Sequence, residues 1–176
     1  MYTRRGDTGN TDTGRGERIS KGSFLIDVQG DLDELGSFVG VAMATTTWDD
    51  IRSGLEQVQR DLFTIGEQIT SNGKRRTISE ERLKWLEERI DEYSKEFGKV
   101  TLFVLQGGSA QSASLHVTRT VCRRTERDIT RAEIGKNYTT LIPSYINRLS
   151  SYFFFLALVS NKRLGVEEKI WPLKYP

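Results

Sequence analysis

The chain has 176 residues, the length of a single domain. Charged residues make up 28% of it and hydrophobic residues 36%, a composition that excludes wholesale disorder. The 26 basic and 24 acidic side chains leave a net charge of +2, which gives no general attraction to nucleic acid or membranes. One cysteine and one histidine exclude an internal disulfide framework and metal centres built from several cysteines or histidines.

The first 22 residues are polar and rich in turn-forming residues, with glycines at positions 6, 9, 14 and 16. They show neither a helical nor a strand period, so we predict a glycine-rich loop, with a disordered arm as the alternative. Backbone N–H groups of such a loop can form an anion-binding nest, with Lys21 at its end. No G-x-x-x-x-G-K-[S/T] sequence occurs in the chain, so this nest is not a P-loop.

Apolar residues then recur at alternating spacings of three and four, which is typical of antiparallel helix packing. Three such seams follow one another: Leu32, Leu35, Val39 and Ala42; Leu55, Val58, Leu62, Ile65 and Ile69; and Leu83, Leu86, Ile90, Tyr93 and Phe97. Asp31 and Ser79 are the expected N-caps of the first and third helices. We predict an all-α, up-and-down five-helix bundle over residues 31–164, preceded by the loop at residues 1–22, in one domain.

The fourth helix is expected from Ala110 to Glu133, with Ala113, Val117 and Val121 one turn apart. The fifth is expected from Leu141 to Lys162, because Pro143 fits only its first turn.

The segment Tyr152–Val159 is apolar on all sides, so the fifth helix is either central in the bundle or covered by a neighbouring subunit. Asn147 and Arg148 directly precede this segment, and polar groups placed there need partners. With eight residues, the segment is too short to span a bilayer, and no apolar signal segment follows the first residues. We therefore expect a cytoplasmic protein.

An apolar run, Val100–Leu105, lies in the connection Gly98–Gly108 between the third and fourth helices. We interpret the connection as an extended crossover, with a short strand as the alternative.

The fourth helix carries four arginines within nine residues. Arg119, Arg123, Glu126 and Arg127 share one helical face, and Arg124 lies beside them. Arginine suits bidentate contact with phosphate, so this face indicates a triphosphate site. The alternative is a solvated face paired with acids of adjacent helices.

Six segments carry motifs in a fixed order: Tyr2–Gly9, Gly16–Lys21, Asp31–Gly40, Gln59–Gly66, Val121–Arg127 and Tyr145–Phe154. Together they resemble the PduO-type ATP:cob(I)alamin adenosyltransferases over nearly the whole chain. The resemblance implies a homotrimer that transfers the 5′-deoxyadenosyl group of ATP to Co(I) of reduced cobalamin and releases triphosphate. It implies ATP and Mg²⁺ as ligands, cob(I)alamin as substrate, and a reductase and an adenosylcobalamin-dependent client enzyme as partners.

The resemblance also implies site residues in a cleft between subunits. Contacts to ATP would come from the loop of one subunit, through Thr3, Arg4, Arg5, Gly6, Thr11, Asp12 and Lys21, and from its neighbour, through Arg123, Arg124, Glu126, Arg127 and Asn147. Arg119 would pair with Asp33 of an adjacent subunit. Arg123 would act on the leaving triphosphate, and Phe103 would lie against the lower face of the corrin, unless it is a plain core aromatic. No metal ligand among the protein side chains is implied.

Five positions depart from the family pattern: Arg5, Thr8, Asp12, Gly36 and Ser151. Asp12 is the hardest to reconcile with a triphosphate, unless it faces Mg²⁺ or solvent. We interpret His116 and Cys122 as structural. The alternative function is a non-catalytic ATP-binding trimer that acts as a nucleotide sensor or adenosylcobalamin carrier. An RNA-binding bundle is disfavoured, because acids offset the basic residues and no aromatic stacking platform is apparent.

Overall fold

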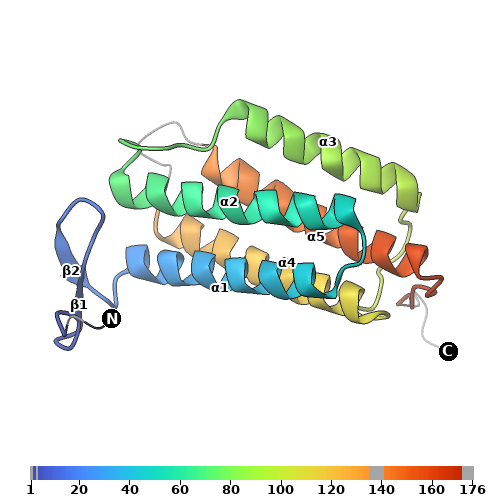
Figure 1. Ribbon diagram of the computed structural model, residues 1–176, viewed down its shortest axis with the longest axis horizontal. Coiled ribbons are helices and arrows are strands. Elements are labelled where there is room, and N and C mark those ends of the chain that lie inside the picture. Colours follow the sequence, from blue (N-terminus) through green and yellow to red (C-terminus); the bar gives the residue numbers. More distant parts are fainter. Residues whose placement is uncertain (1, 3, 135–140, 172–176) are drawn as a thin grey trace.

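Five helices lie side by side, and successive helices run in opposite directions, as predicted (Figure 1). The computed structural model describes residues 2, 4–134 and 141–171. The helices are α1 (Phe24–Thr45), α2 (Asp49–Ser71), α3 (Glu80–Phe97), α4 (Ala110–Arg131) and α5 (Ile142–Arg163). Within this described part, no helix has the length and apolar character needed to cross a membrane.

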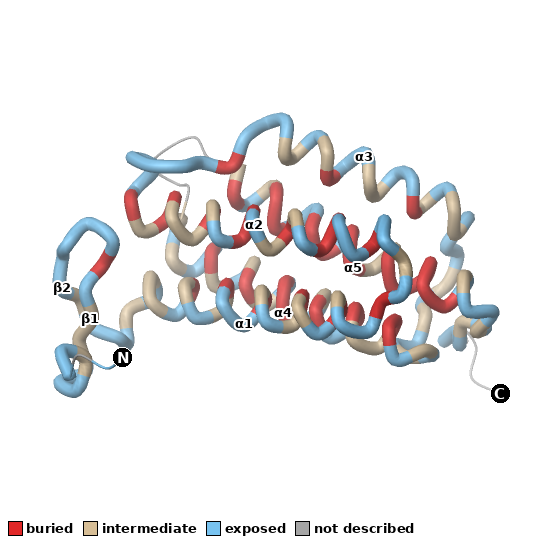
Figure 2. Tube along the Cα trace, viewed as in Figure 1, coloured by how far each residue is buried: buried red, intermediate tan, exposed pale blue. Residues whose placement is uncertain are grey.

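The predicted seams of α1 and α2 are buried at every position, and they line the inner faces of the bundle (Figure 2). α1 packs against α2 and α4, and α5 packs against α3 and α4. Tyr145, Tyr152 and Phe153 of α5 are fully buried. Of the two interpretations of the apolar fifth helix, the central position is therefore correct.

The first helix begins seven residues earlier than residue 31, the predicted start of the bundle. Ser23 occupies the N-cap position and the helix starts at Phe24, so Asp31 is an interior residue and not a cap. Val28 is buried four residues before Leu32 and so adds one more position to the seam. Its packing stabilises the first turns of the helix, although Gly30 is a poor helix former. The predicted cap at Ser79 is confirmed, since its side chain accepts a hydrogen bond from the backbone N–H of Arg82.

The buried face of α4 differs from the expected one. Val117 is 43% exposed, whereas Leu115 and Cys122 are fully buried. Small polar residues fill the side toward α1: the Thr118 hydroxyl lies 3.2 Å from the backbone oxygen of Phe38. Short side chains let α1 and α4 approach closely, and their hydroxyl groups donate hydrogen bonds to backbone carbonyls. Because polar residues thus occupy part of the buried face of α4, its sequence shows only a weak apolar period.

The N-terminal segment is neither an irregular loop nor a disordered arm. Residues Asn10–Asp12 form β1 and Arg18–Ser20 form β2, an antiparallel pair in which Thr11 lies opposite Ile19. The turn is closed by a 2.8 Å hydrogen bond from Thr13 N–H to Glu17 carbonyl. The two strands are only three residues long and none of their side chains is buried, so they lack the alternation of apolar and polar residues that marks a strand in a sequence (Figure 2).

Candidate functional site

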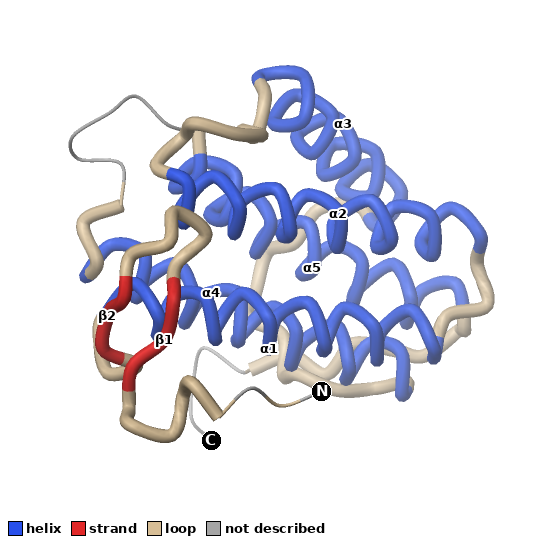
Figure 3. The backbone as a smooth tube through the Cα atoms, turned by 60° about the vertical axis from the view of Figure 1, so that its left-hand side comes forward, coloured by secondary structure: helices blue, strands red, loops and turns tan. Residues whose placement is uncertain are grey.

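The hairpin is an arm at the end of the bundle where α1 begins (Figure 3). Gly6 is close to Lys21: a Cβ on Gly6 would lie 2.8 Å from the Lys21 Nζ atom. Gly9 has φ +77° and its N–H donates to the Gly6 carbonyl, while Lys21 N–H donates to the Gly9 carbonyl. The positive φ favours glycine at position 9, and the hydrogen bonds and the close approach place Lys21 beside the predicted nest. Thr3, also predicted for this site, lies outside the described residues.

Asp12 is neutralised inside the hairpin. Its carboxylate lies 3.1 Å from Arg5 and 3.4 Å from Arg18. Arg18 also donates to the Thr8 hydroxyl and to the Arg5 backbone oxygen. Arg18 belongs to the motif Gly16–Lys21 but was not predicted as a site residue. The departures at positions 5, 8 and 12 thus form one local network, in which two guanidinium groups offset one carboxylate.

On α4 the predicted arginines have different surroundings. Arg124 pairs with Asp31, at 3.4 Å, and with Glu34 of α1. Arg123 is exposed and has no ion-pair partner among the described residues, and its backbone oxygen accepts a 3.0 Å hydrogen bond from Arg127. The solvated-face interpretation, with acids on a neighbouring helix, therefore describes Arg124 but not Arg123.

Asn147 of α5 joins this face. Its Nδ2 atom lies 2.8 Å from the Glu126 Oε1 atom, so the Glu126 carboxylate and the Asn147 amide present one polar edge between α4 and α5. Arg148, the other polar residue before the buried run, lies 3.3 Å from Glu87 of α3.

The arginine face and the hairpin are not bonded to each other in the described part of the chain. Among the described residues, no hydrogen bond or ion pair joins the hairpin to α4 or α5. The crossover that carries Phe103 lies at the opposite end of the bundle from the hairpin (Figure 1). One copy of the chain therefore holds the predicted site residues in separate places.

Phe103 is 74% exposed, so it is not a core aromatic. It lines a hollow of about 410 Å³ together with other crossover residues, Arg119 of α4 and Phe154 of α5. The crossover is extended, and its only bridge among the described residues is Val104 with Ile170, so no strand forms within it.

Arg119 carries a buried charge without a counterion in the described part of the chain. Its Nε atom is buried and has no hydrogen-bond partner. Burial, with the nearby Arg123 as a second cause, lowers the pKa of Arg119. A half-buried cationic group of this kind would be stabilised by an anion from outside the chain.

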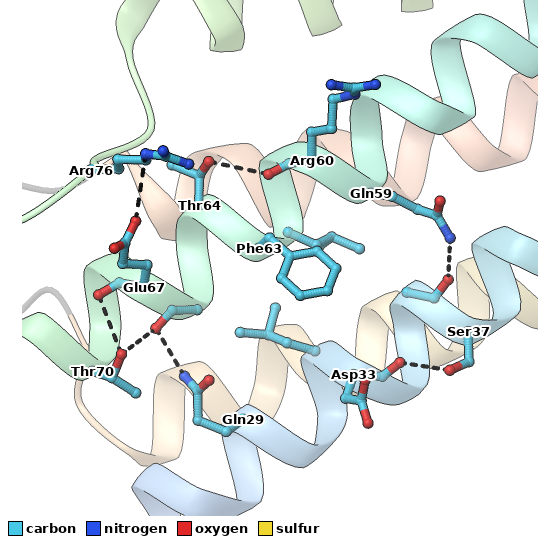
Figure 4. A pocket seen from close by; sticks show the side chains of 14 residues that line it. Gln29, Asp33, Ser37, Gln59, Arg60, Phe63, Thr64, Glu67, Thr70 and Arg76 are labelled. Atoms are coloured by element: carbon cyan, nitrogen blue, oxygen red, sulfur yellow. Dashed lines mark hydrogen bonds and ion pairs between the residues drawn. The ribbon is translucent and has the colours of Figure 1, made fainter. Parts of the chain in front are cut away.

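A second hollow, of about 830 Å³, lies between α1 and α2 (Figure 4). Asp33 lines it, without an ion pair to any described residue, and so does Phe63, which is 80% exposed. Gln29 and Gln59 bridge the two helices by donating to the backbone oxygens of Gly66 and Gly36. Phe63 was not among the predicted site residues, although a large apolar residue outside the seam of α2 is a visible signal.

His116 and Cys122 are buried inside the bundle. Burial lowers the pKa of His116 to about 4, with Arg119 as a smaller cause, and neither ring nitrogen has a hydrogen-bond partner. Burial raises the pKa of the Cys122 thiol, which donates to the Ile146 carbonyl. A neutral imidazole and a protonated, inaccessible thiol support the structural role predicted for both. The described residues contain no cluster of three or more histidine, cysteine or acidic side chains that could hold a metal ion.

Comparison with known proteins gives concordant results. The family model described as cobalamin adenosyltransferase matches residues 1–160. The chain is 36% identical over 172 residues to the corrinoid adenosyltransferase of Bacillus subtilis, covering 94% of this chain and 89% of the relative. It is 31% identical to the human corrinoid adenosyltransferase MMAB, covering 97% of this chain and 72% of that protein.

A solved structure has the same fold. It is a variant of the PduO-type ATP:corrinoid adenosyltransferase from Lactobacillus reuteri complexed with cobalamin and ATP, and it superposes with a TM-score of 0.90 at 29% identity, over 97% of this chain and 98% of the other.

Proposed function

Because this chain belongs to the cobalamin adenosyltransferase family and is an ATP-dependent corrinoid adenosyltransferase, we propose that its active site is assembled from two copies of the chain. The observation that carries the proposal is that, among the described residues, no hydrogen bond or ion pair joins the hairpin to the arginine face within one chain. The hairpin of one subunit would meet α4 of the next, and three such contacts would close a homotrimer.

Asp33 and Arg119 support this arrangement. Asp33 lies in the hollow between α1 and α2, whereas Arg119 lies with Phe154 in the hollow beside the crossover. They belong to different hollows, and neither has an ion pair among the described residues. Pairing Arg119 of one subunit with Asp33 of the next would supply the missing counterion.

ATP would be held from both sides. The nest formed around Gly6 and Gly9, with Lys21 and Arg5, would contact the triphosphate from one subunit. Arg123 and Arg127 would contact it from the other. The remaining expected contacts, Thr3, Arg4, Thr11, Asp12, Arg124, Glu126 and Asn147, belong to the same proposal. Arg124 and Asp12 would act within the ion pairs they already make, by fixing α4 to α1 and shaping the hairpin.

The chemistry needs orientation and charge stabilisation more than a protein nucleophile. We propose that cob(I)alamin is the nucleophile: its cobalt bonds to C5′ of ATP as the C5′–O bond breaks and its electron pair leaves with triphosphate. The protein would align C5′ with the cobalt and stabilise the leaving triphosphate through Arg123 and the nest N–H groups. The protein has no described carboxylate cluster for a metal, so Mg²⁺ would be bound mainly through phosphate oxygens and water and would neutralise the leaving group.

Phe103 would lie against the lower face of the corrin. Its exposed ring at the rim of the hollow is available for such contact. An apolar ring there would keep a coordinating ligand from the cobalt and favour reduction of Co(II) to Co(I).

A turnover assay tests the function directly. Purified protein with ATP and chemically reduced cobalamin should yield the adenosylcobalamin absorption spectrum and one triphosphate per product. Formation of an ATP complex without product would indicate the alternative, a non-catalytic sensor or carrier. A reductase would supply cob(I)alamin in the cell and an adenosylcobalamin-dependent enzyme would take the product. A cytoplasmic location belongs to the same proposal.

A further inference from the structure

Asn161 near the end of α5 connects three segments through one side chain. Its Oδ1 atom accepts a 2.9 Å hydrogen bond from the N–H of Ser109, the N-cap of α4. Its Nδ2 atom donates to the Gly107 carbonyl at 3.0 Å and to Glu168 Oε1 at 2.9 Å. Asn161 is fully buried, and none of these bonds stays within its own helix.

The fit around this amide is close. Gly108 has φ +93°, and a Cβ at that position would lie 2.4–2.7 Å from the side-chain atoms of Asn161. The crossover backbone is therefore in close contact with the Asn161 amide. Any larger residue at position 108 would displace the Asn161 side chain.

The chain beyond α5 continues this contact as far as Phe103. After Glu168, residues 169–171 run antiparallel to the crossover. Leu105 N–H donates to the Lys169 carbonyl at 2.6 Å, and Trp171 N–H donates to the Phe103 carbonyl at 2.7 Å. These two bonds flank Val104, and one of them is accepted by the Phe103 carbonyl, so the exposed ring is carried by a backbone that is bonded on its C-terminal side.

We infer that Asn161 is a positioning residue for Phe103, acting through Gly107 and Ser109 on the crossover and through Glu168 on the segment that pairs with it. The inference rests on the proposed contact between Phe103 and the corrin. It predicts that Asn161 controls the corrinoid side of the reaction and leaves the ATP side unaffected, because the hairpin and Arg123 make none of these bonds.

Asn161→Asp tests the inference with a side chain of nearly the same shape. The carboxylate can still accept from Ser109, but it would face the Gly107 carbonyl and Glu168 without a donor. In the protein without substrates, the Leu105 and Trp171 amides should exchange hydrogen at least about tenfold faster, the effect of losing one hydrogen bond. With saturating ATP and pre-reduced cobalamin, kcat/KM for the corrinoid should fall about 10- to 100-fold, as expected when a reacting group is displaced by about 1 Å. ATP affinity should not change.

Two further variants separate positioning from general damage. Ser160→Ala is the matched control: Ser160 is equally buried on the same helix, but its hydroxyl bonds only the Leu156 carbonyl within α5, so exchange and kinetics should stay as in the wild type. Combining Asn161→Asp with Glu168→Gln restores a donor–acceptor pair with the roles reversed and should recover part of the protection and of kcat/KM.

The outcomes distinguish this inference from the proposal on which it rests. If Asn161→Asp leaves amide exchange or corrinoid kinetics unchanged while Phe103→Ala impairs those kinetics, Asn161 does not position Phe103. If Phe103→Ala leaves corrinoid kinetics unchanged, the corrin contact itself is wrong, whatever Asn161 does. A loss of ATP affinity in Asn161→Asp equal to the loss of corrinoid efficiency would also overturn the inference.

Discussion

Arg123 and Arg124 are adjacent in the sequence, yet the structure gives them different surroundings. The Arg124 guanidinium is engaged by two carboxylates of α1, whereas Arg123 is exposed and has no ion pair among the described residues. Successive residues on a helix point about 100° apart, so one can bind a neighbouring helix while the next faces a ligand. Of these two neighbours, Arg123 is the one that can bind a leaving triphosphate without first breaking an ion pair.

Replacing Arg123 should therefore affect catalysis. Arg123→Ala should lower kcat/KM about 100- to 1000-fold, the cost of removing one donor that stabilises transition-state charge. Arg123→Lys should recover only part, because the planar two-pronged contact is lost. Steady-state kinetics measure both, with Arg131→Ala as control, since Arg131 ends the same helix and pairs only with Asp128 in the described part of the chain. Wild-type kinetics for Arg123→Ala would place Arg123 on a merely solvated face.

His116 makes stability depend on pH. Burial holds its folded pKa near 4, below the unfolded value of about 6.5. Between pH 6.5 and pH 4 the histidine is protonated in the unfolded chain but neutral in the folded chain. The free energy of unfolding should therefore fall as the pH decreases, by up to about 1.4 kcal/mol per pH unit. Above pH 6.5 the imidazole is neutral in both states and contributes no slope.

Urea unfolding at pH 7.0 and 5.5 measures this effect. The chain has a single histidine, so His116→Leu should flatten the dependence over this range. An equal slope in the variant would assign the pH dependence to other groups.

At the scale of elements, the helix ends far from the hairpin are joined by Arg163 at the end of α5. Its guanidinium bonds Asp50 of α2 at 2.8 and 3.0 Å and Glu96 of α3 at 2.7 Å. The Arg163 hydrogen bonds lower the pKa of Asp50. The ring of Trp48 lies 5.5 Å from the same guanidinium. One cation thus ties α2 to the packed pair α3 and α5, with which α2 shares little direct backbone contact.

Arg163→Ala should destabilise the bundle without altering the chemistry. Two carboxylates would lose a shared, partly buried partner, at a cost of about 2 kcal/mol. For a chain of this size that corresponds to a fall in Tm of about 4–8 °C. Calorimetry measures the shift, and kcat/KM at 20 °C should stay near that of the wild type. Lys84→Ala, which removes an exposed pair with Glu88, should leave Tm nearly unchanged.

At the scale of the whole molecule, the proposed trimer accounts for features that one chain leaves incomplete. Arg119 is a half-buried cation with no counterion in the described part of the chain, and the hollow that contains Asp33 exposes Phe63. A cation, a carboxylate and an exposed apolar side chain, with the two charges unpaired among the described residues, are what a heterologous interface between identical subunits would bring together.

Charge reversal tests this assembly. Asp33→Arg and Arg119→Asp should each reduce the trimer in light scattering and reduce activity, because like charges would meet at the interface. The two substitutions together should restore part of both, since the ion pair is rebuilt with reversed sign. An active monomer, or a double variant no better than the single ones, would contradict a pairing of these two residues.

Much of the helical architecture followed from the sequence. The 3-4 spacing of apolar residues places the faces of α1 and α2 without any reference to their neighbours, because a helix displays its own period. Ser79 and Pro143 mark helix beginnings by local chemistry alone. The motifs identified the candidate site residues, and the structure adds what surrounds those within its described residues.

What only the tertiary structure decided involves residues distant in the chain. Asp61, 4% exposed, binds Arg82 of α3 and accepts a 2.6 Å hydrogen bond from Tyr145 of α5, and no local pattern predicts that partnership. The partners of Arg124, the exposure of Phe103 and the role of Asn161 likewise depend on which helices lie side by side. Periodicity reports which face of a helix is buried, but a hydrogen bond between helices depends on their relative placement, which the packing of the whole core determines.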